Sequence, residues 1–308
     1  MKKFQSLRIV FMGTPEFAVA SLDALVKAGC TIVGVITAPD KPGGRGMQLQ
    51  QSSVKKYAIE HNLKVLQPEK LKDPEFLEEL KALQADLQIV VAFRMLPEAV
   101  WNMPRMGSVN LHGSLLPQYR GAAPINWAVI NGEKETGVTS FKLKHEIDTG
   151  DILLQESFTI GEDETAGEVH DKMKEIGAKV LVQTVKGLAD GSLKEKSQPE
   201  SDIKHAPKIH TDTCRINWSL TAENIHNLVR GLSPYPGAYI VMNEKMFKIF
   251  RSKKEVTFPK VTEGEYETDG KTFLKFACAD GYLYLLEVQL EGKKKMEITE
   301  FLKGYRFN

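Results

Sequence analysis

The first half of the chain alternates short apolar runs with segments of helical periodicity. Continuous apolar runs at residues 7–13, 31–37, 87–93 and 108–113 predict buried strands, because strands covered on both faces read as unbroken hydrophobic stretches. Between these runs, apolar side chains recur at helical spacing, with proline and glycine marking helix starts and ends. The alternation predicts an α/β fold: a doubly wound domain with a mostly parallel sheet and helices on both faces.

The pattern continues to residue 191. Strand-like runs at 137–144 and 151–160 precede a long amphipathic helix. Thr165 and Glu168 have the spacing of a capping box at the start of this helix, and Gly191 ends it.

The second half has a different character. Residues 192–207 are polar and contain proline, which is typical of a linker. Short strand-like runs separated by turn signals follow, and they predict a small antiparallel barrel of the OB type. We therefore expect a catalytic domain at 1–191, a linker at 192–207 and a second domain at 208–308.

Composition narrows the class of protein without identifying it. A chain of 308 residues with 42% hydrophobic and 26% charged residues is an ordinary globular protein large enough for two domains. No apolar run reaches the roughly 18 residues of a membrane-spanning helix, and no small-residue cleavage site follows the first strand. We expect a cytoplasmic location, and nothing in the pattern requires more than a monomer.

The cysteines and histidines predict neither a disulfide framework nor a metal site. The three cysteines are odd in number and far apart in sequence. His205, His210 and Cys214 lie near one another, but their spacing matches no standard zinc site.

Several familiar catalytic patterns are missing. The first strand ends in MGTPEFA, which has one glycine where a dinucleotide fingerprint needs three. The GxSxG, Walker and HExxH patterns do not occur either.

The strongest chemical signal lies at the end of the strand SVNLHG. Asn110 and His112 are two residues apart, so they project to the same face of the strand about 6.6 Å apart along it. The turn that follows places them at the carboxyl end of a strand, where doubly wound sheets bind ligands. An acid reaching His112 would orient the ring and stabilise its charge, and both Asp148 and Asp151 compete for that role.

The motifs around these residues resemble those of the folate-dependent formyltransferases. The resemblance rests on segments spread over almost the whole chain: GTPEFA at 13–18, PDKPGGRG at 39–46, NLHGSLLPQYRGAAP at 110–124, DTGDIL at 148–153 and RINWSLTAENIHNLVRGL with SPYPGAY at 215–239. It implies a Rossmann-like catalytic domain followed by an OB-like domain that binds tRNA.

The same resemblance implies an activity and its residues. The reaction is transfer of the formyl group of 10-formyltetrahydrofolate, the co-substrate, to the α-amino group of methionyl initiator tRNA. The implied catalytic residues are Asn110, His112 and Asp148. The folate is expected to contact the turn formed by Ser114, Leu115, Leu116 and Pro117.

The tRNA is expected to contact the loop after the second strand. Arg45 and Lys41 lie in this glycine-rich stretch, which carries no acid between Asp40 and Glu60. An arginine in such a loop can reach a phosphate or stack on a terminal base.

Three features depart from the family pattern. The residues after Arg45 lack further lysines, so the loop depends more heavily on Arg45 and Lys41. Arg94 stands where relatives commonly have glycine, and it either touches the acidic tail of the cofactor or points to solvent. His145 and Glu146 are expected at the surface.

Two other functions remain open at this stage. One is a folate-dependent formyltransferase that acts on a small amine, such as glycinamide ribonucleotide or an amino sugar. The other is a nucleic-acid-binding module in which only the barrel acts. The second domain and the Arg45 loop disfavour the first, and the Asn110, His112 and Asp148 set disfavours the second.

Overall fold

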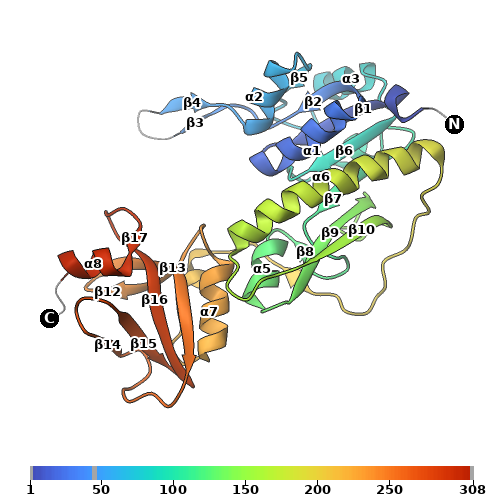
Figure 1. The fold of residues 1–308 in the computed structure, drawn as a ribbon. Coiled ribbons are helices and arrows are strands. Elements are labelled where there is room, and N and C mark those ends of the chain that lie inside the picture. The colour runs from blue at the N-terminus through green and yellow to red at the C-terminus, as the bar shows by residue number, and fades with distance from the viewer. Residues whose placement is uncertain (1–2, 44–46, 306–308) are drawn as a thin grey trace. The chain divides into compact units, whose positions relative to one another are not determined.

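The computed structural model describes residues 3–43 and 47–305, which form two compact units (Figure 1). The first unit takes in the residues up to Gly121 together with 137–158 and 170–205, and the second takes in 122–136, 159–169 and the chain from Ala206 onward. Two segments of the expected catalytic domain, 122–136 and 159–169, therefore belong to the second unit. The contiguous domains at 1–191 and 208–308 with a linker at 192–207 stay a prediction.

A mixed sheet of seven strands forms the centre of the first unit. Its order is β5-β2-β1-β6-β7-β9-β10, in which β5 through β7 are parallel and β9 is antiparallel to β7. The strands are β1 (Arg8–Gly13), β2 (Thr31–Ile36), β5 (Val65–Leu66), β6 (Leu87–Val91), β7 (Ser108–His112), β9 (Glu135–Lys142) and β10 (Ile152–Thr159). All of β6 and all of β1 beyond Arg8 are buried, as their apolar runs predict.

The helices that precede Gly191 are α1 (Glu16–Lys27), α2 (Ser53–Glu60), α3 (Pro74–Ala82), α4 (Glu98–Trp101), α5 (Pro124–Ile130) and α6 (Ala166–Asp190), and a 3-10 turn η1 (Phe4–Ser6) precedes β1. Side chains cap α2, α3 and α6, through Ser52, Asp73 and Thr165. The predicted capping box is present: Thr165 N donates to Glu168 Oε2 at 2.8 Å, and Glu168 N donates to Thr165 Oγ1 at 3.3 Å. Gly177 brings α6 onto the sheet, because a Cβ there would lie 2.9 Å from Leu111.

The glycine-rich stretch after β2 is not a simple loop. β3 (Lys41–Gly43) and β4 (Gln48–Gln50) pair as an antiparallel hairpin. Its base is tied to the unit by Lys55 Nζ, which lies 2.6 Å from Asp40 Oδ2.

The second unit contains the antiparallel sheet that the turn signals predict. Its path is β12-β13-β16-β15-β14, with β17 on the side of β16. The strands are β12 (Ala238–Met242), β13 (Lys245–Val256), β14 (Tyr266–Thr268), β15 (Leu274–Cys278), β16 (Gly281–Leu290) and β17 (Met296–Glu297). Asn243 and Glu244 both have positive φ, as the tight turn between β12 and β13 requires.

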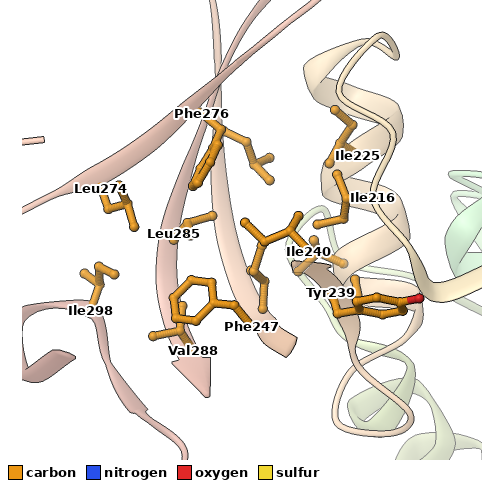
Figure 2. Packing of buried hydrophobic residues seen from close by; sticks show 14 of the residues in the cluster. Ile216, Ile225, Tyr239, Ile240, Phe247, Leu274, Phe276, Leu285, Val288 and Ile298 are labelled. Carbon is orange, nitrogen blue, oxygen red and sulfur yellow. The ribbon is translucent and has the colours of Figure 1, made fainter. Parts of the chain in front are cut away.

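The core of this unit lies between its sheet and two helices, α7 (Ala222–Gly231) and α8 (Ile298–Gly304). Figure 2 shows Phe247, Leu285 and Val288 of the sheet with Ile225 of α7 and Ile298 of α8. The predicted fold class, a doubly wound mostly parallel sheet followed by an antiparallel β domain, is confirmed.

Three short elements complete the chain. They are β8 (Arg120–Gly121), which pairs with β11 (His205–Ala206), and the 3-10 turn η2 (Thr211–Cys214). Over the described residues, no helix is both long and apolar enough to cross a membrane.

The strand order marks where the first unit can bind a ligand. The connection reverses direction at β1, because β2 lies on one side of β1 and β6 on the other. In doubly wound sheets this switch point opens a crevice at the carboxyl ends of the strands. β6 and β7 end on the same edge, at Val91 and His112.

Candidate functional site

β7 carries the two polar side chains singled out by the sequence. Asn110 is half-buried and pairs in register with Val90 of β6 and Phe141 of β9. His112 is the last residue of β7 and is buried, with 7% of its surface exposed. The two-residue repeat of the strand turns both side chains to the same face.

A backbone carbonyl orients the ring of His112. Its Nε2 lies 2.9 Å from the carbonyl oxygen of Tyr119. Because a carbonyl oxygen only accepts hydrogen bonds, Nε2 carries the proton and Nδ1 is the atom that faces elsewhere. Tyr119 has φ of +58°, so the chain turns sharply at the residue that supplies this acceptor.

Asp148 is the acid that faces the imidazole. Its Oδ2 lies 3.8 Å from Nδ1 of His112 and accepts a hydrogen bond from Gly121 N at 3.0 Å. Asp151, the competing candidate, pairs with Lys144 at 2.8 Å. The structure therefore places Asp148, not Asp151, beside the ring, at a distance that allows charge stabilisation without a direct hydrogen bond.

The turn after His112 is held rigidly by β9 and β10. Thr139 Oγ1 donates to Ser114 O at 2.7 Å and accepts from Leu116 N at 3.0 Å. Gln155 Nε2 donates to Leu116 O at 2.9 Å, and Ser114 Oγ donates to Gln118 O at 2.6 Å. Ser114, Leu116 and Pro117 are buried and Leu115 is half-buried, so these four residues form a fixed platform directly after His112.

The sequence did not predict that Gln198 and Arg120 lie near Asp148. Gln198 Nε2 donates to the carbonyls of Asp148 and Gly150, and Gln198 Oε1 accepts from Arg120. Arg120 stands in a recognisable motif, but its spacing gives no sign of this contact. Gln198 lies in the segment expected to be a linker, 50 residues from Asp148, and no periodicity points to it.

The loop residues expected to reach tRNA are described only in part. Lys41 is exposed in β3, opposite Gln50 of β4. Arg45 lies outside the described residues. Met47 and Leu49, which follow it, are 70% and 71% exposed.

The residues that depart from the family pattern lie at the surface. Arg94 donates from its guanidinium to the carbonyl oxygens of Pro68 and of Glu69, the latter at 2.8 Å. This exposed side chain therefore ties the loop after β6 to the loop after β5. His145 and Glu146 are exposed, as expected.

Among the described residues, no group of three or more histidine, cysteine, aspartate or glutamate side chains could hold a metal ion.

Burial raises the pKa of the Cys30 thiol to about 11, because a thiolate is poorly solvated there. This thiol stays protonated near neutral pH and is a poor nucleophile.

The site thus combines an amide donor, an oriented imidazole and a buried carboxylate beside a rigid turn. An amide N–H can stabilise negative charge that develops on a carbonyl oxygen. A carboxylate near an imidazole can stabilise positive charge on the ring and help to move a proton. Such a set suits acyl transfer to an amine.

Known proteins share both halves of this chain. A family model described as formyl transferase matches residues 7–185, and one described as formyl transferase, C-terminal domain, matches residues 208–306. Methionyl-tRNA formyltransferase of Parabacteroides distasonis is 54% identical over 99% of this chain and 98% of its own length. The enzyme of the same name from Bacteroides fragilis is 51% identical over 99% of this chain and 97% of its own length.

Solved structures agree at the level of the fold. An N-formyltransferase from Helicobacter canadensis, solved with folinic acid and dTDP-3-aminofucose, superposes with a TM-score of 0.69 at 22% identity, covering 91% of this chain and 98% of its own. Similarity at this identity establishes a shared fold. Together with the two family models and the relatives above 50% identity, it places this chain in the formyl transferase family.

Proposed function

We propose that this protein transfers the formyl group of 10-formyltetrahydrofolate to the α-amino group of methionyl initiator tRNA, giving formylmethionyl-tRNA for translation initiation. The observation that carries the proposal is the match to methionyl-tRNA formyltransferases at 51% and 54% identity over nearly the full length of both proteins. Such a match covers the catalytic unit and the second domain alike. The N-formyltransferase solved with dTDP-3-aminofucose also covers 91% of this chain, but at only 22% identity.

The arrangement of β7 supports this chemistry. Attack of the amine on the formyl carbon forms a carbon–nitrogen bond and places negative charge on the formyl oxygen. Asn110 can donate its side-chain N–H to that oxygen, and removal of one such donor typically lowers kcat by about a hundredfold to a thousandfold. Collapse of the intermediate then breaks the bond to the folate nitrogen and releases tetrahydrofolate.

Proton movement is assigned to His112 and Asp148. The α-amino group has a pKa of about 7.7, so a sizeable fraction is already neutral and able to attack at neutral pH. After attack, the new ammonium must lose a proton and the departing folate nitrogen must gain one. His112 and Asp148, with Nδ1 and Oδ2 3.8 Å apart, form a coupled pair that stabilises the intermediate and carries this proton, through water where the gap requires it.

The folate substrate is assigned to the turn from Ser114 to Pro117. The turn is fixed to β9 through Thr139, and three of its four residues are apolar. A turn fixed in this way suits a flat ring system, because little conformational freedom is lost on binding. The turn begins two residues after His112, so a ring resting on it has its reactive nitrogen near the polar pair.

The tRNA is assigned to the β3–β4 hairpin and the second domain. Lys41 and Arg45 give the hairpin two positive charges, and the hairpin strands contain no acid. Cationic side chains on an exposed hairpin suit contact with phosphates, which bind with strong salt dependence. A cytoplasmic location and a monomeric state are part of the same proposal.

One assay tests the function. Purified protein is incubated with 10-formyltetrahydrofolate and methionyl initiator tRNA, and formylmethionine is measured after the ester bond is hydrolysed. Parallel reactions contain glycinamide ribonucleotide or a dTDP-linked amino sugar as the acceptor. Formylation of the tRNA alone supports the proposal, whereas formylation of a small amine in place of the tRNA contradicts it.

A further inference from the structure

The side chain of Gln198 joins three segments of the first unit around Asp148. Its Nε2 donates to the carbonyl oxygens of Asp148 at 2.8 Å and of Gly150 at 2.9 Å. Its Oε1 accepts from Arg120 Nε at 3.1 Å and Nη2 at 2.6 Å. Both amide hydrogens and the amide oxygen are therefore used at one point.

Together with a hydrogen bond from Gly121, these contacts fix both the backbone carbonyl and the carboxylate of Asp148. The carbonyl of Asp148 is held by Gln198, and Gln198 is held by Arg120. The next residue, Gly121, donates its backbone N–H to Oδ2 of Asp148 at 3.0 Å. The segment at Arg120 and Gly121 thus orients the carboxylate directly and the backbone of Asp148 through Gln198.

The backbone of Asp148 needs such support. Its φ of +55° lies in the left-handed region, which residues other than glycine seldom occupy because Cβ crowds the following carbonyl, although aspartate and asparagine enter it more readily than other side chains. A conformation of this kind persists only where surrounding contacts hold it. If the chain relaxed to a negative φ, the side chain would leave its place 3.8 Å from Nδ1 of His112.

A purely structural role would be to fasten the segment 192–207 to the unit, but other bonds already do this. Before Gln198, Ile152 and Lys196 exchange two backbone hydrogen bonds of 2.7 and 2.9 Å. After it, Arg120 N donates to Lys204 O at 3.0 Å. Gln198 is half-buried between exposed neighbours, and its bonds go to the turn that contains Asp148.

We propose that Gln198, fixed by Arg120, is a positioning residue that holds Asp148 in its working conformation for formyl transfer. This inference rests on the proposed function and deepens it. Gln198 acts through the backbone of Asp148 and does not touch the reacting atoms. The segment after α6 is then a part of the catalytic unit.

The test is Gln198→Met, which keeps the size of the side chain and removes its hydrogen bonds. We expect kcat to fall by about tenfold to a hundredfold, because small displacements of a catalytic group cost this much. KM for both substrates should stay within about threefold of the wild-type value, because substrate-binding groups are untouched. The melting temperature should fall by no more than about 4 °C, as for the loss of roughly 1 kcal/mol.

A double-mutant cycle separates positioning from a general structural effect. In an Asp148→Asn background the carboxylate that Gln198 positions is gone, so Gln198→Met should lower kcat by less than about threefold further. Gln5→Met is the control, since it makes the same change in the first unit, at an exposed glutamine of η1. Its kcat should equal that of the wild type.

Two results would overturn the inference: a wild-type kcat for Gln198→Met, or an undiminished loss in the Asp148→Asn background. Should Gln198→Met fail to fold, Arg120→Lys carries the same test. This variant keeps the positive charge but cannot donate two hydrogen bonds to Gln198 Oε1 as arginine does. It should lower kcat by about threefold to tenfold, and only when Asp148 is present. If the wild-type protein formylates no tRNA, the proposed function fails instead, and the two failures are distinguished.

Discussion

The imidazole of His112 donates from Nε2 to the carbonyl oxygen of Tyr119 at 2.9 Å. The residue that orients the ring is therefore seven positions further along the chain, and it acts through its backbone. This contact turns Nδ1 towards Asp148, 3.8 Å away. A catalytic role for the pair stays a prediction, and the following experiments examine it together with its surroundings.

Asn110→Ala removes the amide expected to stabilise the oxyanion. The variant should show kcat lower by about a hundredfold or more, because such a donor acts chiefly in the transition state. Its fold should persist, since the side chain is only half-buried and the backbone of β7 keeps its pairing with β6 and β9. Steady-state formylation kinetics and a thermal melt measure the two effects, and activity within a few-fold of wild type would exclude the oxyanion role.

Asp148→Asn removes the charge beside His112 and keeps an oxygen that can accept from Gly121. We expect kcat to fall by about a hundredfold or more, as for loss of a general acid–base group. Asp151→Asn is the matched control, because it makes the same change three residues away in a side chain paired with Lys144. Its kcat should stay within about twofold of wild type, since an ion pair of this kind contributes little. Equal losses in the two variants would contradict the assignment of Asp148.

Arg45→Ala tests the hairpin as a tRNA contact. The variant should raise KM for methionyl initiator tRNA and reduce the salt dependence of that KM by about one charge, because one cation fewer meets the phosphates. KM for 10-formyltetrahydrofolate should not change. Lys27→Ala, which removes a 75% exposed lysine on α1, serves as the control. A tRNA KM equal to that of the wild type would rule out the contact.

We expect the stability of the folded protein to depend on pH through His226 of α7. Burial lowers the pKa of His226 below its usual value, and the charges of Arg230 and Lys254 act in the same direction, whereas Asp163 opposes them. In the unfolded chain the ring titrates near its usual pKa of about 6.5. At pH values between the lower pKa of the folded state and about 6.5, the unfolded state binds more protons at this ring than the folded state does. The protein is therefore most stable above a pH of about 6.5 with respect to this group, and it loses stability as the pH falls below that value.

The measurement is the melting temperature at about pH 7.5 and about pH 5.5. The fall between the two should be smaller in His226→Gln than in the wild type, because glutamine does not take up a proton. His145→Gln removes an exposed histidine and should keep the full wild-type fall. An equal fall in all three proteins would show that His226 does not carry the effect.

Much of the fold follows from local patterns in the sequence. The buried strands, the capping box at Thr165 and Glu168, and the antiparallel character of the second half were predicted from periodicity and turn residues alone. The β3–β4 hairpin was missed, because glycine and proline in 38–47 hide the strand pattern on either side. The sequence also did not predict that residues 122–136 and 159–169 belong to the second compact unit, since this depends on contacts between distant segments.

The sequence by itself determined which residue types stand at the end of β7 and to which family the motifs point, because side-chain alternation and motif spacing are local properties. Only the tertiary structure decided that Asp148 rather than Asp151 faces His112, and that Tyr119 orients the ring. It alone joined Gln198 to Asp148. These contacts depend on backbone carbonyls and a left-handed φ at Asp148, which are set by how distant segments pack rather than by any local pattern.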